Sequence, residues 1–187
     1  MARVTLDGLT AVAADLADQV GFENVTVSAL ARHFGVRGAS LYSHIRNLAE
    51  LRSLVAAQAI GELADQVALA VAGRSGRSAL VAFAHAHRDY ARQYPGRYAA
   101  TQLELDEPAA PVAAAARRYS DLSRVVLRGY RLPEPDQTDA LRMLGATLHG
   151  YVTLEASGGF RHHPRPTEAS WERTLDALDA VLGAWPG

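Results

Sequence analysis

Cationic and hydroxyl side chains gather in one short segment, residues 37–46, in a pattern suited to binding nucleic-acid phosphates. The segment carries two arginines, two serines and a tyrosine, and no acidic residue occurs between Glu23 and Glu50. Arg, Ser and Tyr side chains donate hydrogen bonds to phosphate oxygens, and Arg also pairs with guanine. The acid-free window alone is weak support, because residues 66–88 also lack acids. The argument for DNA therefore depends on the elements that present this segment.

Two short helices joined by a tight turn must position these residues. Thr26 can cap a helix that runs to about Phe34, and Gly35 suits the left-handed conformation that the turn requires. A second helix is predicted over residues 38–45. The two helices share an apolar set that we expect to form their core: Leu30, Phe34, Val36, Leu41 and Ile45. This pattern is that of a helix-turn-helix.

The residues outside this core face outward on the second helix. They are Arg37, Gly38, Ala39, Ser40, Ser43 and Arg46, with Tyr42 and His44 at the flanks. Two of them, Gly38 and Ala39, are small enough to let the helix approach base edges and thymine methyl groups. Spacing alone leaves two interpretations open, a DNA-reading surface or two packed helices of a protein that binds no DNA.

Other chemistry is poorly represented. The chain has no cysteine, so it offers no thiolate nucleophile and no thiolate metal site. His85 and His87 are two residues apart and lie on different helix faces, while His162 and His163 belong to a proline-flanked loop. No nucleophile elbow, phosphate loop or dinucleotide fingerprint occurs. We predict no catalytic residues, no metal, no cofactor and no enzymatic activity.

Composition indicates an ordinary globular chain that is helical nearly throughout. The 187 residues have a net charge of -1, with 49% hydrophobic and 21% charged residues, which fits one domain or two small ones. Because 18 consecutive apolar residues never occur and the first 20 residues include three aspartates, we expect a cytoplasmic protein without a membrane span. Apolar periodicity predicts an all-α fold of about nine helices. The longer ones span about 5–20, 47–72, 78–94, 109–130 (one helix or a pair), 136–156 and 167–183. Asn47, Asp136 and Thr167 can cap the helices that begin at these positions.

Residues 5–55 resemble the N-terminal domain of the TetR family of bacterial transcriptional regulators. The resemblance is carried by Gly21-Phe22-Glu23, Thr26 with Leu30-Ala31, Gly35-Val36 and Leu41-Tyr42-Ser43-His44. Farther along, Leu148-His149-Gly150, with Gly159-Phe160 after it, is similar to a histidine-glycine signature in one class of TetR C-terminal domains. The resemblance implies a three-helix helix-turn-helix domain at residues 1–47 and a larger helical domain for ligand binding and dimerisation at residues 48–187.

The resemblance also implies contacts with an operator. Thr26 would cap its helix and touch a phosphate, Arg37 to Ser40 would face bases, and Tyr42 and His44 would hold phosphates. Two positions depart from the family pattern. Leu48 stands where a lysine is common, and Ser28 stands where some members carry a base-reading arginine. These departures imply weaker phosphate binding or a different operator.

The last two long helices, 136–157 and 167–183, would form a homodimer by the same resemblance. Their apolar positions would supply the contact area: Leu141, Leu144, Leu148, Leu175, Leu178, Val181 and Leu182. The alternative is that these residues complete the core of the single chain. A small-molecule pocket is implied within residues 50–155. Its candidate lining residues are Phe83, His87, Tyr90, Tyr94, Tyr98, Tyr119, Met143, His149 and Tyr151. The alternative for each is an ordinary core side chain, which is the more common role of a Tyr or His at such positions.

The prediction from the sequence is a repressor that a small-molecule ligand releases from a palindromic double-stranded DNA operator. Two-fold symmetry would place two recognition helices about 34 Å apart, one turn of DNA. Two other classes stay open: a helical binding module without operator recognition, and a regulator that is ligand-independent or ligand-activated. The ligand, the operator sequence and the regulated genes are not encoded in any pattern found.

Overall fold

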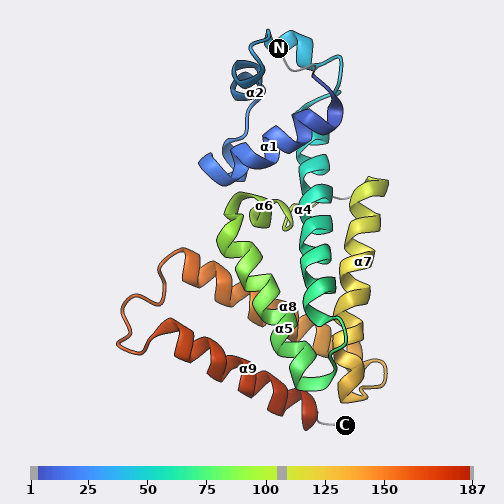
Figure 1. Cartoon of the computed structure of the whole chain (residues 1–187), viewed down its shortest axis with the longest axis vertical. Coiled ribbons are helices and arrows are strands. Elements are labelled where there is room, and N and C mark those ends of the chain that lie inside the picture. The colour runs from blue at the N-terminus through green and yellow to red at the C-terminus, as the bar shows by residue number, and fades with distance from the viewer. Residues whose placement is uncertain (1–3, 105–108, 186–187) are drawn as a thin grey trace. The chain divides into compact units, whose positions relative to one another are not determined.

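A computed structural model describes residues 4–104 and 109–185 of the chain (Figure 1). Within those ranges it contains nine α-helices, two short 3₁₀ helices and no strand, so the predicted all-α fold is confirmed. The contacts divide the chain into two compact units. Unit 1 comprises Met1–Glu62 and Gln93–Tyr119, and unit 2 comprises Leu63–Arg92 and Ser120–Gly187.

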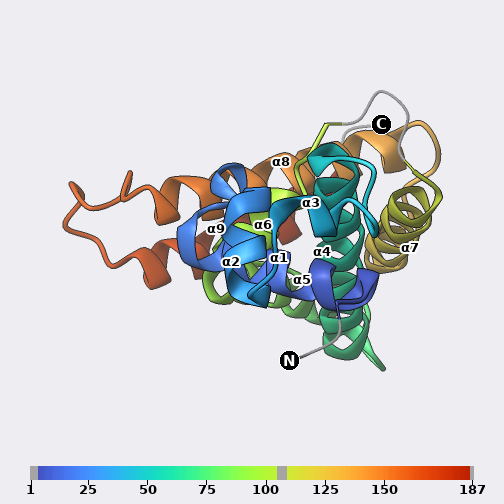
Figure 2. The same cartoon turned by 90° about the horizontal axis from the view of Figure 1, so that it is seen from above.

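Unit 1 contains the predicted helix-turn-helix together with part of the following chain. Its complete elements are α1 (Leu6–Val20), η1 (Phe22–Asn24), α2 (Val27–Phe34), α3 (Gly38–Leu41) and α6 (Pro95–Ala100). The first half of α4 (Leu48–Val71) and of α7 (Ala110–Leu127) also belongs to it. Figures 1 and 2 both show α6 beside α1. Unit 1 is thus larger than the predicted domain 1–47, whose boundary remains a prediction.

Unit 2 is built on three long helices. They are α5 (Gly76–Gln93, of which Gln93 falls in unit 1), α8 (Asp136–Ala156) and α9 (Thr167–Gly183), joined by the second halves of α4 and α7 and by η2 (Arg128–Tyr130). Helices α8 and α9 run antiparallel and are connected by the turn 157–166 (Figure 1). The stretch 109–130, predicted as one helix or a pair of helices, forms α7 followed directly by η2.

Side-chain caps explain where several helices begin. Thr5 accepts the Gly8 amide at 3.1 Å, Thr26 accepts the Ala29 amide at 3.2 Å, and Asn47 accepts the Glu50 amide at 2.8 Å. These caps satisfy amides that the first helical turn leaves unpaired. The predicted roles of Thr26 and Asn47 as caps are confirmed.

Two other predicted caps are wrong. Asp136 and Thr167 are the first residues of α8 and α9, and neither makes a side-chain cap. Pro135 and Pro166 occupy the capping positions instead, which moves both polar residues one place into the helix.

Helix α4 is apolar because it packs in the core. By length and composition it could cross a membrane, with a mean hydropathy of 1.4 over an 18-residue window, although no 18 consecutive residues are apolar. Five of its side chains are buried at helical spacing: Leu51, Val55, Ala59, Leu63 and Val67. Of that window, 39% is buried, and the core helix of a globular protein can pass the same test of length and composition.

Candidate nucleic-acid interface

The turn between α2 and α3 has the geometry that its glycine predicts. Gly35 adopts φ +65° and ψ +32°, in the left-handed region, and its amide donates to the Arg32 carbonyl at 3.3 Å. The side chains of Leu30, Leu41 and Ile45 are buried between the helices, with Phe34 and Val36 partly buried against them. The predicted helix-turn-helix core is therefore present.

Helix α3 is shorter than predicted. It ends at Leu41, so Tyr42, Ser43 and His44 lie in a turn after the helix rather than within it. This turn is ordered by local bonds, since the Ser43 hydroxyl donates to the Ser40 carbonyl at 2.7 Å and the Ile45 amide donates to the Leu41 carbonyl at 3.2 Å. The turn keeps Ile45 in the core while its polar residues stay outside.

The predicted DNA-facing residues form one exposed set on this scaffold. Nine of the ten are exposed: Thr26, Ser28, Arg37, Ala39, Ser40, Tyr42, Ser43, His44 and Arg46. The tenth, Gly38, is half-buried, and a Cβ added there would lie 3.8 Å from Val27 Cγ1. Tyr42 is one of seven large hydrophobic side chains exposed among the described residues. This surface presents cations and hydroxyls without a carboxylate of its own; we call it the reading face.

Arg46 is held at the edge of the reading face by the first turn of α4. Its Nε donates to Glu50 Oε1 at 3.0 Å, and its amide donates to Glu50 Oε2 at 2.5 Å. The Arg46 amide bond is the main cause that lowers the pKa of Glu50 below its ordinary value. Glu50 therefore stays ionised and fixes the start of α4, which was not foreseen from the sequence.

A second feature missed by sequence reasoning positions α1, the helix that supports the reading face. Within unit 1, Arg97 on α6 forms ion pairs with Asp15 and Asp18 on α1 and, at 3.5 Å, with Glu62 on α4. The Arg97 amide donates to Asp18 Oδ1 at 2.9 Å, whereas its Nε lies 3.2 Å from Asp18 Oδ2 without hydrogen-bond geometry. Burial raises the pKa of Asp18, although these contacts favour its charge. We call this set the Arg97 cluster.

The predicted ligand-lining residues are divided between the two units. In unit 2, Phe83, His87 and Tyr90 are buried and Met143, His149 and Tyr151 are half-buried; in unit 1, Tyr98 is buried and Tyr94 and Tyr119 are half-buried. Within unit 2 the rings of Phe83 and His87 stack with centroids 6.4 Å apart. Burial, with a smaller effect of His149, lowers the pKa of His87 to about 4. His87 is therefore neutral at pH 7.

The predicted dimer residues on α8 and α9 differ in how far the single chain buries them. Five leucines are buried within the single chain: Leu144, Leu148, Leu175, Leu178 and Leu182. A side chain that already packs in the chain's own core adds little new buried area against a partner. Leu141 is half-buried, and Val181 is exposed. These five leucines contribute to the core of the single chain, and the dimer surface itself stays a prediction.

A buried arginine network joins the helices of unit 2. The guanidinium of Arg88 on α5 is 1% exposed and makes paired hydrogen bonds to Glu155 on α8, at 2.7 and 2.9 Å, and to Glu168 on α9, at 2.9 and 3.0 Å. Arg92 also contacts Glu155, at 2.8 Å. Burial alone would lower the pKa of Arg88, but the bonds and charges of the two glutamates raise it above its ordinary value. The charged guanidinium therefore links α5 to α8 and α9 through these hydrogen bonds.

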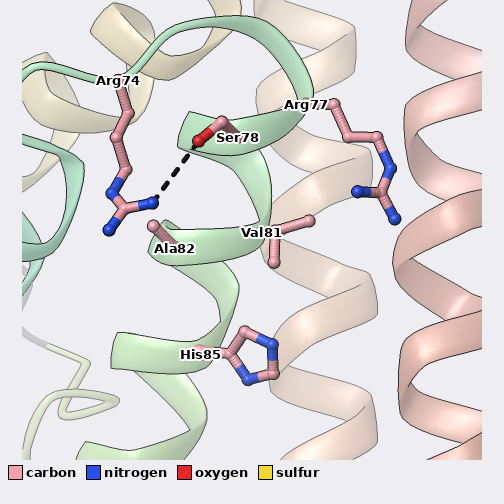
Figure 3. A pocket seen from close by; sticks show the side chains of 6 residues that line it. All are labelled: Arg74, Arg77, Ser78, Val81, Ala82 and His85. Atoms are coloured by element: carbon pink, nitrogen blue, oxygen red, sulfur yellow. Dashed lines mark hydrogen bonds between the residues drawn. The ribbon is translucent and has the colours of Figure 1, made fainter.

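An open groove of about 560 Å³ runs along the first half of α5 in unit 2 (Figure 3). Its lining residues are Arg74, Arg77, Ser78, Val81, Ala82 and His85. Arg77 pairs with Asp176 at 2.6 Å, and His85 Nε2 lies 3.3 Å from Glu172 Oε1. Figure 3 shows Arg74 on the opposite side, bonded to Ser78. None of the predicted ligand residues lines this groove.

These features define a helical protein with an exposed helix-turn-helix surface. Residues 9–52 match the family model described as bacterial regulatory proteins, tetR family, and residues 80–178 match that of the tetracyclin repressor-like C-terminal domain. Two HTH-type transcriptional regulators, both uncharacterized, are similar in sequence. YobS of Bacillus subtilis is 34% identical over 148 residues, 79% of this chain and 77% of YobS. Rv0681 of Mycobacterium tuberculosis is 32% identical over 158 residues, 84% and 72% of the two chains.

Solved structures agree on the fold. A Rhodococcus sp. RHA1 protein of unknown function superposes with a TM-score of 0.81 at 22% identity, covering 97% of both chains. A TetR variant from Acinetobacter baumannii AYE, in complex with minocycline, gives a TM-score of 0.73 at 20% identity and covers 99% of both chains. The chain belongs to the TetR family and is a transcriptional regulator of the helix-turn-helix type.

Proposed function

We propose that the chain is a repressor that binds a near-palindromic operator as a homodimer and leaves it when a small molecule binds. The observation that carries this proposal is the reading face. Its arginines and hydroxyls are exposed, while the apolar residues of the same two helices are buried. In this arrangement Arg37 and Ser40 reach base edges, Thr26 and Tyr42 hold phosphates, and the small Ala39 allows close approach.

Fluorescence anisotropy with the DNA upstream of the chain's own gene tests operator binding. The wild type is compared with Arg37→Ala and Tyr42→Ala at two salt concentrations, on the upstream duplex and on a scrambled one. Each substitution is expected to weaken specific binding by about five- to a hundredfold, and the salt slope is expected to fall only for Arg37→Ala, which removes a cation, since Tyr42→Ala removes a neutral hydroxyl. Arg117→Ala on α7, also an exposed arginine, is the matched control and leaves affinity unchanged.

Equal, weak binding of all variants to both duplexes would contradict operator recognition through the reading face. The chain would then be a helical binding module that has kept the fold. Leu48 stands where the family commonly has a lysine, so one phosphate contact is expected to be missing. Binding should therefore be measured first at low salt, where weak phosphate contacts contribute most.

Ligand release is proposed to act through the Arg97 cluster within unit 1. Helix α6 contacts α1 through Arg97, and α1 packs on α2, so displacement of α6 would disturb the support of the reading face. A coupling of about 1.4 kcal/mol is enough for a tenfold change in operator affinity. The Acinetobacter TetR variant of similar fold is in complex with minocycline in its crystal structure, which supports a small-molecule effector here without identifying it.

We also propose a class for the C-terminal domain, a domain boundary, a location in the cell and the absence of catalysis. The Leu148-His149-Gly150 stretch would mark the class of C-terminal domain, and His149 lies half-buried near His87 in unit 2. We infer a functional boundary near residue 47 and a cytoplasmic location. We also infer that the chain has no catalytic activity, because a regulator of this kind works by binding DNA. Operator affinity measured with and without a candidate ligand decides its role. A lower affinity identifies an inducer, a higher one a co-repressor, and equal affinities reject that ligand.

A further inference from the structure

A small cavity lies at the turn between α8 and α9, entirely within unit 2. It has a volume of about 220 Å³. Six residues line it: Tyr151, Phe160, His163, Arg165, Thr167 and Ser170. Only Tyr151 is among the residues proposed above to line a ligand pocket. We call this cavity the turn cavity.

The turn cavity carries positive charge that no carboxylate of the described residues neutralises. The turn 157–166 contains two arginines and two histidines and no acid. Neither His163 nor Arg165 forms an ion pair within residues 4–104 and 109–185; Arg165 donates only a long bond, 3.4 Å, to the Ala169 carbonyl. The groove of Figure 3 differs, because its Arg77 and His85 face carboxylates of α9.

Two glutamates of α8 and α9, Glu155 and Glu168, are already paired with other cations. Glu155 and Glu168 together receive the hydrogen bonds of Arg88 and Arg92, so two negative charges meet two positive ones. The bond from Arg88 lowers the pKa of Glu155, which keeps this carboxylate charged and engaged. The positive charge of Arg165 is therefore left to the cavity and to solvent.

The remaining walls are aromatic rings and hydroxyls. The rings of Tyr151 and Phe160 lie 4.9 Å apart between centroids. The Tyr151 hydroxyl donates to the Thr167 carbonyl at 2.8 Å, which leaves its ring as the apolar wall. The hydroxyls of Thr167 and Ser170, also in the lining, can donate to an anion. The volume is below the 300 to 1,000 Å³ typical of drug-sized sites, so the occupant must be small (about one ring with a short substituent).

The geometry points to a binding site for a small aromatic carboxylate in the turn cavity. The carboxylate is held by Arg165, with the hydroxyls of Thr167 and Ser170 beside it, and the ring packs against Phe160 and Tyr151. This site shares only Tyr151 with the residues predicted to line an effector pocket, and it does not depend on operator binding.

Benzoate is the probe for this site, followed by ¹H–¹⁵N correlation spectra of the full-length protein. Addition of benzoate is expected to shift amides between residues 151 and 170 in a saturable way. Benzamide keeps the ring without the charge and acetate keeps the charge without the ring, so both are expected to bind about tenfold more weakly or worse. Arg165→Gln is expected to weaken benzoate binding by about tenfold.

Arg173→Gln is the matched control, since Arg173 is an exposed arginine on α9 that does not line the cavity. It should bind benzoate like the wild type. The proposal is overturned if benzoate shifts no amide in residues 151–170, if Arg165→Gln binds it as well as Arg173→Gln does, or if benzamide binds equally well. Because the readout needs no DNA, failure here leaves the anisotropy result on the operator untouched.

Discussion

One buried histidine makes the stability of this protein depend on pH. Burial lowers the pKa of His87 to about 4, whereas an unfolded histidine titrates near 6.5. Between these values the unfolded chain binds a proton that the folded chain excludes, so stability is fully present above pH 6.5 and falls as the pH drops toward 4. The difference corresponds to about 3 kcal/mol of unfolding free energy. Urea unfolding at several pH values measures it.

A His87→Leu variant tests whether this residue is the source. The substitution will change the absolute stability through packing. Between pH 6.5 and 4, however, the unfolding free energy of the variant should fall by about 3 kcal/mol less than that of the wild type. His162→Gln, in the exposed turn after α8, keeps the wild-type profile. Parallel profiles for wild type and His87→Leu would show that His87 is accessible to protons in the folded state.

At the scale of elements, the sequence was sufficient where the signal is local. Apolar periodicity predicted α8 and α9 with their observed ends, and Thr26 and Gly35 correctly placed the start and the end of α2. The predicted exposure of the reading face followed from assigning its core first. The caps at Asp136 and Thr167 failed because a preceding proline takes the capping position.

Contacts between distant segments left no such signal. Arg97 meets Asp15 across 82 residues, and Arg88 meets Glu155 and Glu168 across 67 and 80. No spacing rule predicts an ion pair between residues so far apart in the sequence. The same charged residues could equally have been exposed to solvent. The burial of leucines on α8 and α9 was likewise undecidable, since a core face and a dimer face have the same composition.

The fit between α6 and α1 gives a prediction at this scale. Gly96 lies so close to α1 that an added Cβ would meet the Ala17 carbonyl group at 2.0 Å and the Asp18 amide nitrogen at 2.5 Å. Because these are backbone atoms, Gly96→Ala must separate the two helices, with an expected loss of about 2 kcal/mol or more in unfolding free energy. Denaturant titration followed by circular dichroism measures this loss.

Gly61→Ala is the matched control for that substitution. Gly61 lies inside α4, where an added Cβ would meet nothing within 4 Å, and alanine favours a helix by up to about 1 kcal/mol. The same change is therefore expected to be neutral or stabilising at one glycine and destabilising at the other. Equal effects at both positions would contradict the close packing of α6 on α1.

At the scale of the whole molecule, the proposed dimer must use what α8 and α9 leave exposed. Leu154 is 50% exposed and Val181 is 46% exposed, while Gly145 and Ala146 present an exposed surface that allows close helix approach. A palindromic operator requires two copies of the reading face related by a two-fold axis. The dimer is therefore a condition for tight operator binding by this chain.

Introducing a charge on this surface tests the dimer directly. Leu154→Glu and Val181→Glu place carboxylates where a partner would bury them unpaired, a cost of several kcal/mol. Light scattering should then report the 20.0 kDa monomer in place of a species of twice that mass, and operator affinity should fall with it. Leu69→Glu on α4, where the leucine is 80% exposed, is the matched control and should remain dimeric. If all three variants keep the wild-type mass, the two copies meet through another surface. That other surface would then determine how the two reading faces are placed on DNA.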